Sequence, residues 1–193
     1  LKGARIVTDL VTVTGTENLM MAACLAEGNT VIENAAREPE IVDLARCLIS
    51  MGAKIQGAGT DIISVEGVSQ LHSASHRVIP DRIEAGTFIC AVAACGGSVF
   101  VRNFDKEIMG LSYEKLQLCG GEFLEVDGGL QVNFARRPKA VSYQTAPYPG
   151  FATDMQAQLM AVNAVSDGVA LIDESIFENR FMHVSEMQRM GAD

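Results

Sequence analysis

The sequence predicts an α/β fold built from repeated β-α-β-α-β-β units. Three glycines spaced about 70 residues apart each follow a mostly apolar, helix-like run: Gly28, Gly97 and Gly168. A second helix-like run ends at another glycine 23 or 24 residues after each of them: Gly52, Gly120 and Gly191. The first helical run of each copy is apolar on most faces, so other layers must cover it. We therefore expect units that share buried helices, with the sheets outside.

The first copy predicts its elements in order. A threonine-rich stretch at 9–16 suits a loop or a helix N-cap. Gly28 can take the left-handed conformation that ends a helix, and Pro39 suits the first turn of the next one. The expected elements are strands at 4–8 and 30–33, helices at 17–26 and 39–51, and a hairpin that pairs Ile55 with 62–65 across the turn 57–59.

The other two copies repeat this order. The second copy is expected from about 76 to 134, with Asp127-Gly128-Gly129 as its hairpin turn. The third begins near 140 and ends after its second helix, where the first two enter a hairpin. The chain is therefore expected to be a piece of a longer protein. The polar stretch 70–77 is the expected domain boundary.

Composition excludes several classes of function. The net charge of −9 disfavours a nucleic-acid or anionic membrane surface, and no apolar run reaches the length of a membrane span. No signal peptide is expected at the start. The five cysteines are not spaced as a zinc or redox motif, so we expect a reduced, cytoplasmic protein with inert thiols and neither metal nor cofactor.

Polar loops precede the first helix of every copy. They hold the threonines of 12–16 in copy 1, Pro80-Asp81-Arg82 in copy 2 and the stretch 149–154 in copy 3. Free backbone N–H groups at helix N-termini favour phosphates. Plain capping explains Thr14, Thr16 and Asp81 as well.

Asp154 and Arg180 are the strongest single candidates. Asp154 ends a loop that contains two prolines and a glycine, and a carboxylate held there could take a proton from a hydroxyl; the alternative is a capping aspartate. Arg180 could bind a carboxylate or phosphate, or pair with Glu178 or Asp173. His183 has no partner ligand in the sequence, which favours a structural role.

Four long motifs resemble the UDP-N-acetylglucosamine 1-carboxyvinyltransferase family over essentially the whole chain. They are ENAAREPE at 33–40, PDRIEAGT at 80–87, TDMQAQ at 153–158 and ENRFMHV at 178–184. The sister family, 3-phosphoshikimate 1-carboxyvinyltransferase, shares the fold without these motifs. The resemblance implies the enolpyruvyl transferase inside-out barrel, whose two domains each contain three units. Residues 1–78 would be the last unit of one domain, and 79–193 one complete and one truncated unit of the other.

The family transfers the enolpyruvyl group of phosphoenolpyruvate to the 3-hydroxyl of UDP-N-acetylglucosamine and releases phosphate, in the first committed step of peptidoglycan synthesis. The resemblance implies that Asp154 is the base, that Ile176 contacts the nucleotide sugar and that Arg180 borders the active site. It also implies that a loop binds the diphosphate region, formed by Leu10, Val11, Thr12 and Val13.

Two departures from the family pattern occur in these loops. Leu10 stands where many members have lysine, and Ala152 stands where proline is common. The family's general acid, a cysteine or aspartate, lies upstream of Leu1 in the resemblance, as do the phosphoenolpyruvate contacts. We therefore expect residues 1–193 alone to be inactive and to self-associate through surface left exposed. The alternatives are a non-catalytic nucleotide-sugar-binding or interaction domain and a 3-phosphoshikimate 1-carboxyvinyltransferase-like enzyme.

Overall fold

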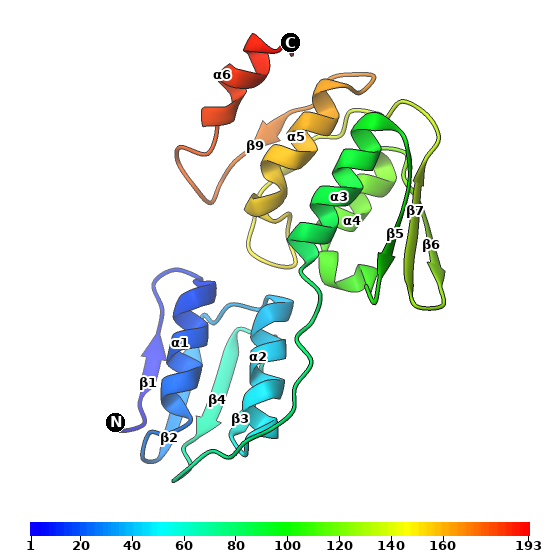
Figure 1. The fold of residues 1–193 in the computed structure, drawn as a ribbon. Helices are drawn as coiled ribbons and strands as arrows, with labels where there is room; N and C mark the ends of the chain where they lie inside the picture. The colour runs from blue at the N-terminus through cyan, green and yellow to red at the C-terminus, as the bar shows by residue number, and fades with distance from the viewer. The chain divides into compact units, whose positions relative to one another are not determined.

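The computed structural model describes all of residues 1–193, which divide into two compact units, Leu1–Ile79 and Pro80–Asp193. Unit 1 is a four-stranded sheet with two helices on one face (Figure 1). Its elements are β1 (Arg5–Val7), α1 (Val13–Ala23), β2 (Asn29–Glu33), α2 (Pro39–Ser50), β3 (Lys54–Gln56) and β4 (Ile62–Glu66). The predicted β-α-β-α-β-β order is confirmed for this copy.

The sheet of unit 1 has the strand order β1-β2-β4-β3. β1 runs parallel to β2, and the other two pairs are antiparallel. Ile32 of β2 and Ile63 of β4 are opposite each other in the register and are fully buried. They pack with Met20 of α1 and Ile41 of α2 in one apolar cluster. The two helices thus cover the face to which the alternating apolar residues point.

The first helix begins earlier than the sequence predicts. Thr12 has an extended backbone, and its hydroxyl oxygen accepts a hydrogen bond from the N–H of Gly15 at 3.2 Å, so α1 begins at Val13 rather than at 17. The helix is thus capped by a threonine of the predicted stretch 9–16, but by Thr12 and not by Thr14 or Thr16, and the predicted start of the helix is wrong. The second helix begins at Pro39 as predicted, and Gly52 follows it with φ +99°.

Unit 2 contains eleven elements. They are α3 (Arg82–Cys95), β5 (Gly97–Arg102), η1 (Lys106–Met109), α4 (Leu111–Leu118), β6 (Glu122–Val126), β7 (Gly129–Phe134), β8 (Tyr143–Gln144), η2 (Thr153–Met155), α5 (Gln156–Ala164), β9 (Ile172–Asp173) and α6 (Met182–Arg189), where η marks a 3-10 helix. β5, β7 and β6 form an antiparallel sheet in that order, and β8 pairs with β9 in parallel. Gly128, with φ +83°, turns the β6–β7 hairpin at the predicted place.

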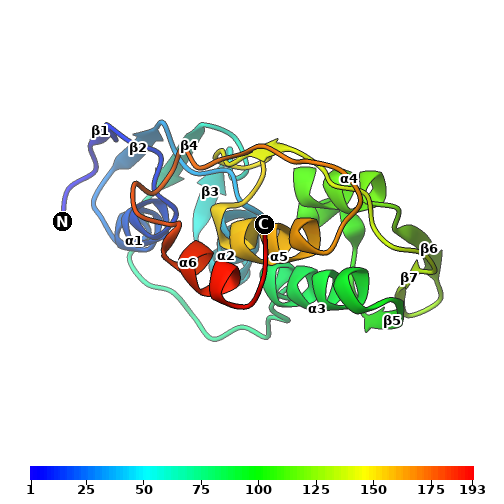
Figure 2. The same cartoon turned by 90° about the horizontal axis from the view of Figure 1, so that it is seen from above.

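Helix α3 is the centre of unit 2. It contacts β5, β7, α4 and α5, and Figure 2 shows α3 beside α5. Ile89 and Ala93 of α3 are fully buried in the apolar cluster of the unit. A Cβ atom at Gly86 would lie 2.7 Å from Cε of Met155, so this glycine allows η2 to approach α3 closely. Helix α3 therefore fixes the position of the turn that carries Asp154.

The second copy lacks the predicted first strand near 76–79. Residues 68–81 contain no strand, and β5 is an edge strand. The backbone N–H of His72 donates instead to the carbonyl of Met51 at 2.9 Å, and Nε2 of His76 lies 3.0 Å from Oδ1 of Asp43. The stretch up to Ile79 therefore belongs to unit 1, because its polar groups find partners there and not in a sheet with β5.

Asp81 caps α3, as the capping alternative predicts. Its Oδ1 accepts hydrogen bonds from the backbone N–H groups of Ile83 and Glu84 at 2.8 and 3.1 Å. Asp81→Ala should lower the free energy of unfolding by about 1 kcal/mol, the usual cost of a lost N-cap. Equilibrium urea unfolding measures the change, and Asp81→Asn, which retains an acceptor oxygen, is the matched control. Equal losses in the two variants would contradict the capping role.

All five cysteines are free, and three of them are buried. Burial raises the pKa of the Cys90 thiol to about 12 and that of Cys119 to about 11. Burial also raises the pKa of Cys24, whereas Cys95 is exposed at the end of α3. A thiol attacks as the thiolate, so the buried three are chemically protected in the folded protein.

Exposed apolar side chains remain on both units. They include Met21 on α1, Leu25 two residues after the end of α1, and Phe88 on α3. Val169 and Leu171 are more exposed still, at 96% and 76%, next to β9. β9 pairs on one side only, with β8. No helix has the length and apolar character that crossing a membrane requires.

Candidate functional site

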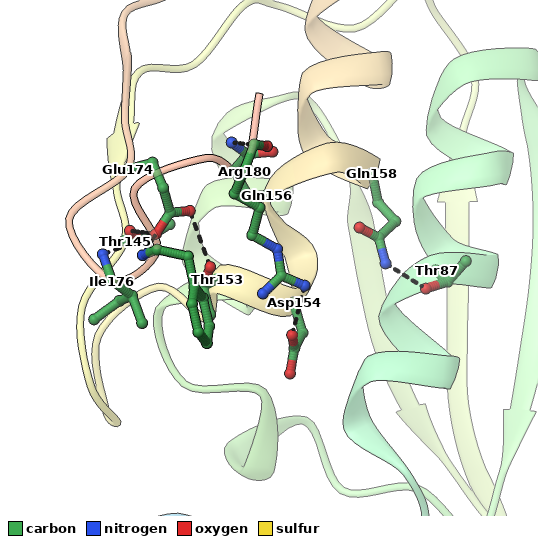
Figure 3. Close-up of polar contacts among 10 residues, drawn as sticks. Thr87, Thr145, Thr153, Asp154, Gln156, Gln158, Glu174, Ile176 and Arg180 are labelled. Carbon is green, nitrogen blue, oxygen red and sulfur yellow. Dashed lines mark hydrogen bonds and ion pairs between the residues drawn. The ribbon is translucent and has the colours of Figure 1, made fainter. Parts of the chain in front are cut away.

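The candidate site lies where the two parallel strands of unit 2 end. β8 is followed by Thr145 and β9 by Glu174, and the N–H of Thr145 continues the ladder to the carbonyl of Asp173 at 2.9 Å. The segments that leave these strands carry Asp154 and Arg180 (Figure 3). In open α/β sheets, ligands bind beyond the carboxyl ends of parallel strands. The fold therefore brings the polar side chains of two separate segments to one edge.

The loop between Thr145 and η2 is closed on itself. The N–H of Ala146 donates to the carbonyl of Phe151 at 3.0 Å, and the N–H of Gly150 donates to the carbonyl of Pro147 at 2.9 Å. Phe151 is 1% exposed, and its ring centroid is 4.4 Å from that of Tyr143. One buried aromatic ring thus anchors the loop to the core just before the 3-10 turn.

Asp154 does not cap a helix. The N-cap position of η2 is Ala152, which makes no side-chain hydrogen bond. Oδ1 of Asp154 instead accepts from Nη2 of Arg180 at 2.7 Å, and the Asp154 side chain is 59% exposed. The capping alternative for Asp154 is therefore wrong, and so are Glu178 and Asp173 as partners of Arg180.

Arg180 is held at three points. Its guanidinium pairs with Asp154, and its Cζ lies 5.2 Å from the centroid of the Phe177 ring. Its backbone carbonyl accepts from Nε2 of the buried Gln156 at 3.4 Å. A guanidinium over an aromatic face gains a cation–π attraction. These contacts give the cation a fixed direction toward Asp154.

Glu174 is a functional candidate that sequence reasoning missed. Its Oε1 accepts from the Thr145 hydroxyl at 2.8 Å and from the N–H groups of Ile176 and Phe177 at 2.9 and 3.1 Å. Its Oε2 accepts from the Thr153 hydroxyl at 2.9 Å. The only sequence signal for it is a carboxylate directly after a strand.

The hydrogen bonds to Glu174 determine its protonation. Burial alone would raise the pKa of this carboxyl, but the four hydrogen bonds favour the ionised form more strongly, so its pKa lies below the ordinary value of 4.5. The surrounding segments therefore favour the ionised form of Glu174 over the neutral acid.

The lowered pKa of Glu174 predicts a pH dependence of stability. A carboxyl whose pKa is lowered on folding contributes stability that is present above the unfolded pKa and is lost as the pH falls through the folded value. We expect the free energy of unfolding to fall less steeply below about pH 4.5 in Glu174→Gln than in the wild type. Urea unfolding between pH 3 and 7 tests this, and parallel curves would contradict it.

Ile176 and Arg180 also border an open hollow at the surface, together with residues 177–179. The Ile176 side chain is 38% exposed, and its N–H is bound by Glu174. The structure thus brings three predicted residues, Asp154, Ile176 and Arg180, into one region of unit 2.

The other predicted residues belong to unit 1. Leu10 is 79% exposed and Val11 39% exposed, Thr12 caps α1, and Val13 is its first residue. Thr14 and Thr16 do not cap this helix: Asn18 binds the carbonyl of Thr14, and the buried Thr16 hydroxyl accepts from the N–H of Ala36 at 3.0 Å. The predicted diphosphate contacts at 10–13 stay a prediction.

His183 lies in α6, partly buried, and its buried Nε2 atom has no hydrogen-bond partner. No cluster of three or more His, Cys, Asp or Glu side chains that could hold a metal ion is present.

The EPSP synthase (3-phosphoshikimate 1-carboxyvinyltransferase) family matches residues 1–193. The enolpyruvyl transferase NikO from Streptomyces tendae superposes with a TM-score of 0.80 at 21% identity, over 91% of this chain and 42% of its own. EPSP synthase from Acinetobacter baumannii gives a TM-score of 0.72 at 18% identity, over 100% of this chain and 46% of its own.

The chain spans less than half the length of these two solved structures. Their likeness confirms the predicted α/β enolpyruvyl transferase fold, and the resemblance to enolpyruvyl transferases is confirmed at the level of the family. The family match covers every residue of the sequence. The chain therefore belongs to the EPSP synthase (3-phosphoshikimate 1-carboxyvinyltransferase) family.

Proposed function

We propose that these residues are part of a longer, cytoplasmic UDP-N-acetylglucosamine 1-carboxyvinyltransferase. The reaction adds the 3-hydroxyl oxygen of the sugar to C2 and a proton to C3 of phosphoenolpyruvate, and then releases phosphate by breaking the bond between C2 and the phosphate oxygen as C3 loses a proton. It needs a base for the hydroxyl proton and an acid for the vinyl carbon. The product is the first committed intermediate of peptidoglycan synthesis.

The geometry of Asp154 is the observation that carries this proposal. Arg180 binds Oδ1, while Oδ2 accepts no hydrogen bond from the protein, and the side chain is more than half exposed. One oxygen of the carboxylate is thus oriented, and the other is available to take a proton from a bound hydroxyl. Asp154 caps no helix, so helix capping does not account for a carboxylate oriented at this place.

The choice of acceptor rests on the motifs. The stretches 153–158 and 178–184 resemble the UDP-N-acetylglucosamine enzymes, and they contain the Asp154–Arg180 pair. The second candidate acceptor is shikimate 3-phosphate, which the description of the matching family and the structure from Acinetobacter baumannii favour. The two acceptors differ in that only the first carries a nucleotide.

Phosphate release by the full-length protein that contains residues 1–193 tests the proposal. We expect release with phosphoenolpyruvate and UDP-N-acetylglucosamine together, and none with phosphoenolpyruvate alone. Release with shikimate 3-phosphate instead would move the protein to the second candidate. No release with either acceptor, together with measurable binding of the nucleotide sugar by calorimetry, would support a non-catalytic binding domain.

A further inference from the structure

Glu174 connects the two segments that carry the candidate base and its arginine. Thr153, whose hydroxyl donates to Oε2 of Glu174, directly precedes Asp154. Ile176 and Phe177, whose N–H groups donate to Oε1, begin the segment that reaches Arg180. Figure 3 shows the carboxylate of Glu174 between Thr153 on one side and Ile176 on the other.

The strand end fixes Glu174 itself. The Thr145 hydroxyl after β8 donates to Oε1, and its oxygen accepts from the N–H of Ser175 at 2.9 Å. Hydrogen bonds to an ionised acceptor are shorter and stronger than those between neutral groups. One carboxylate therefore ties the end of β8, the start of η2 and the segment after β9 to a common point.

We propose that Glu174 is a positioning residue for Asp154: it sets the direction of the base carboxylate relative to Arg180 and to the backbone at Ile176. It touches neither reacting atom and acts through Thr153 on one side and through 176–177 on the other. This inference rests on the proposed function, because a direction of Asp154 matters only if Asp154 takes a proton. Misplacement of a reacting group by about 1 Å can cost about a hundredfold in rate.

Three variants separate this role from general folding. Glu174→Ala removes all four hydrogen bonds. Glu174→Gln keeps an acceptor oxygen for three donors and presents an amide that can donate to the Thr153 hydroxyl. Its kcat should therefore be much closer to that of the wild type than the kcat of Glu174→Ala. Thr153→Val removes only the connection to the Asp154 turn and leaves Glu174 bound by its other partners. It remains informative if Glu174→Ala does not fold.

Matched controls lie in the same unit. Glu122→Gln changes an exposed carboxylate of β6 that accepts a side-chain hydrogen bond from Asn133. Thr87→Val changes an exposed hydroxyl of α3 that bonds Gln158. Both should leave kcat within about twofold of the wild type, the scatter expected for surface substitutions.

The deciding measurement is a double-mutant cycle in the full-length protein. We measure kcat and KM for UDP-N-acetylglucosamine in the wild-type and Asp154→Asn backgrounds, corrected for the folded fraction from thermal unfolding. Glu174→Ala should lower kcat by about 10- to 100-fold and Thr153→Val by about tenfold. Neither should lower it by more than about twofold in Asp154→Asn, because residues that act through one group are not additive.

The outcomes distinguish this inference from the proposed function. An active wild type whose kcat is unchanged by Glu174→Ala and Thr153→Val overturns the positioning role alone. Equal losses in both backgrounds also overturn it, since they indicate a structural role independent of Asp154. A wild type without transfer to UDP-N-acetylglucosamine overturns the proposed function and this inference with it.

Discussion

Asp154→Asn should lower kcat of the full-length protein by 10²- to 10⁴-fold, the range expected when a general base is lost. The carboxamide cannot take the hydroxyl proton. Its oxygen can still accept the hydrogen bond from Arg180, which is 2.7 Å long in the wild type. The local geometry is therefore retained, and the loss reports proton transfer. KM for UDP-N-acetylglucosamine should change little by comparison.

A second exposed Asp–Arg pair in unit 2 provides the control. Oδ1 of Asp167 lies 3.3 Å from Nε of Arg137, and both side chains are exposed. Asp167→Asn removes the same charge from the same kind of pair. Asp167 precedes β9 and pairs with Lys139, ahead of β8, so it lies before the two strands and not at their carboxyl ends. The variant should leave kcat within about twofold. If Asp154→Asn behaves like Asp167→Asn in stopped phosphate-release assays, Asp154 orients Arg180 and is not the base.

Phe151→Ala should produce the largest loss of stability, about 3–5 kcal/mol, as for other fully buried aromatic residues. Phe151 is 1% exposed and packs against Tyr143 and the rest of the unit 2 cluster. Its removal leaves a cavity beneath the loop that leads to Asp154. The hydroxyl of Tyr143 would keep its 2.6 Å hydrogen bond to the carbonyl of Gln156, so the loss comes mainly from packing.

Urea unfolding, followed by circular dichroism, measures this loss. Phe88→Ala is the control, because Phe88 is 59% exposed on α3 and its removal creates no cavity. The difference between the two variants should exceed about 2 kcal/mol. Similar midpoints for both would mean that the 145–152 loop contributes little to the folded state of unit 2.

The sequence predicts the elements of this fold where local chemistry decides them. Proline at 39 begins a helix because its fixed φ suits the first turn, and glycine at 128 turns a hairpin because it takes a positive φ. The missing strand before α3 could not be predicted in the same way. Residues 76–79 have the right place in the repeat, but tertiary partners at Met51 and Asp43 hold the segment that contains them.

In the candidate site, too, the sequence predicts what local chemistry decides and not what tertiary contacts decide. A loop with two prolines and a glycine identified Asp154 from its neighbours in sequence, and Arg180 was a candidate because a guanidinium can bind a carboxylate or phosphate. The pairing of the two spans 26 residues and depends on how two loops leave parallel strands. Glu174 could not be predicted from its neighbours in sequence, because its partners Thr145 and Thr153 are 29 and 21 residues away. Contacts between residues so far apart in the sequence form only when the chain folds.

The cysteines of this protein can report the opening of each unit through their rates of alkylation. Cys24 belongs to the core of unit 1, Cys90 and Cys119 belong to the core of unit 2, and Cys95 faces solvent. An alkylating reagent should therefore modify the exposed Cys95 first and the half-buried Cys47 next, and should reach Cys24, Cys90 and Cys119 only when their own unit opens. The rate at each buried sulfur then reports the opening of one unit separately from the other, without any introduced label.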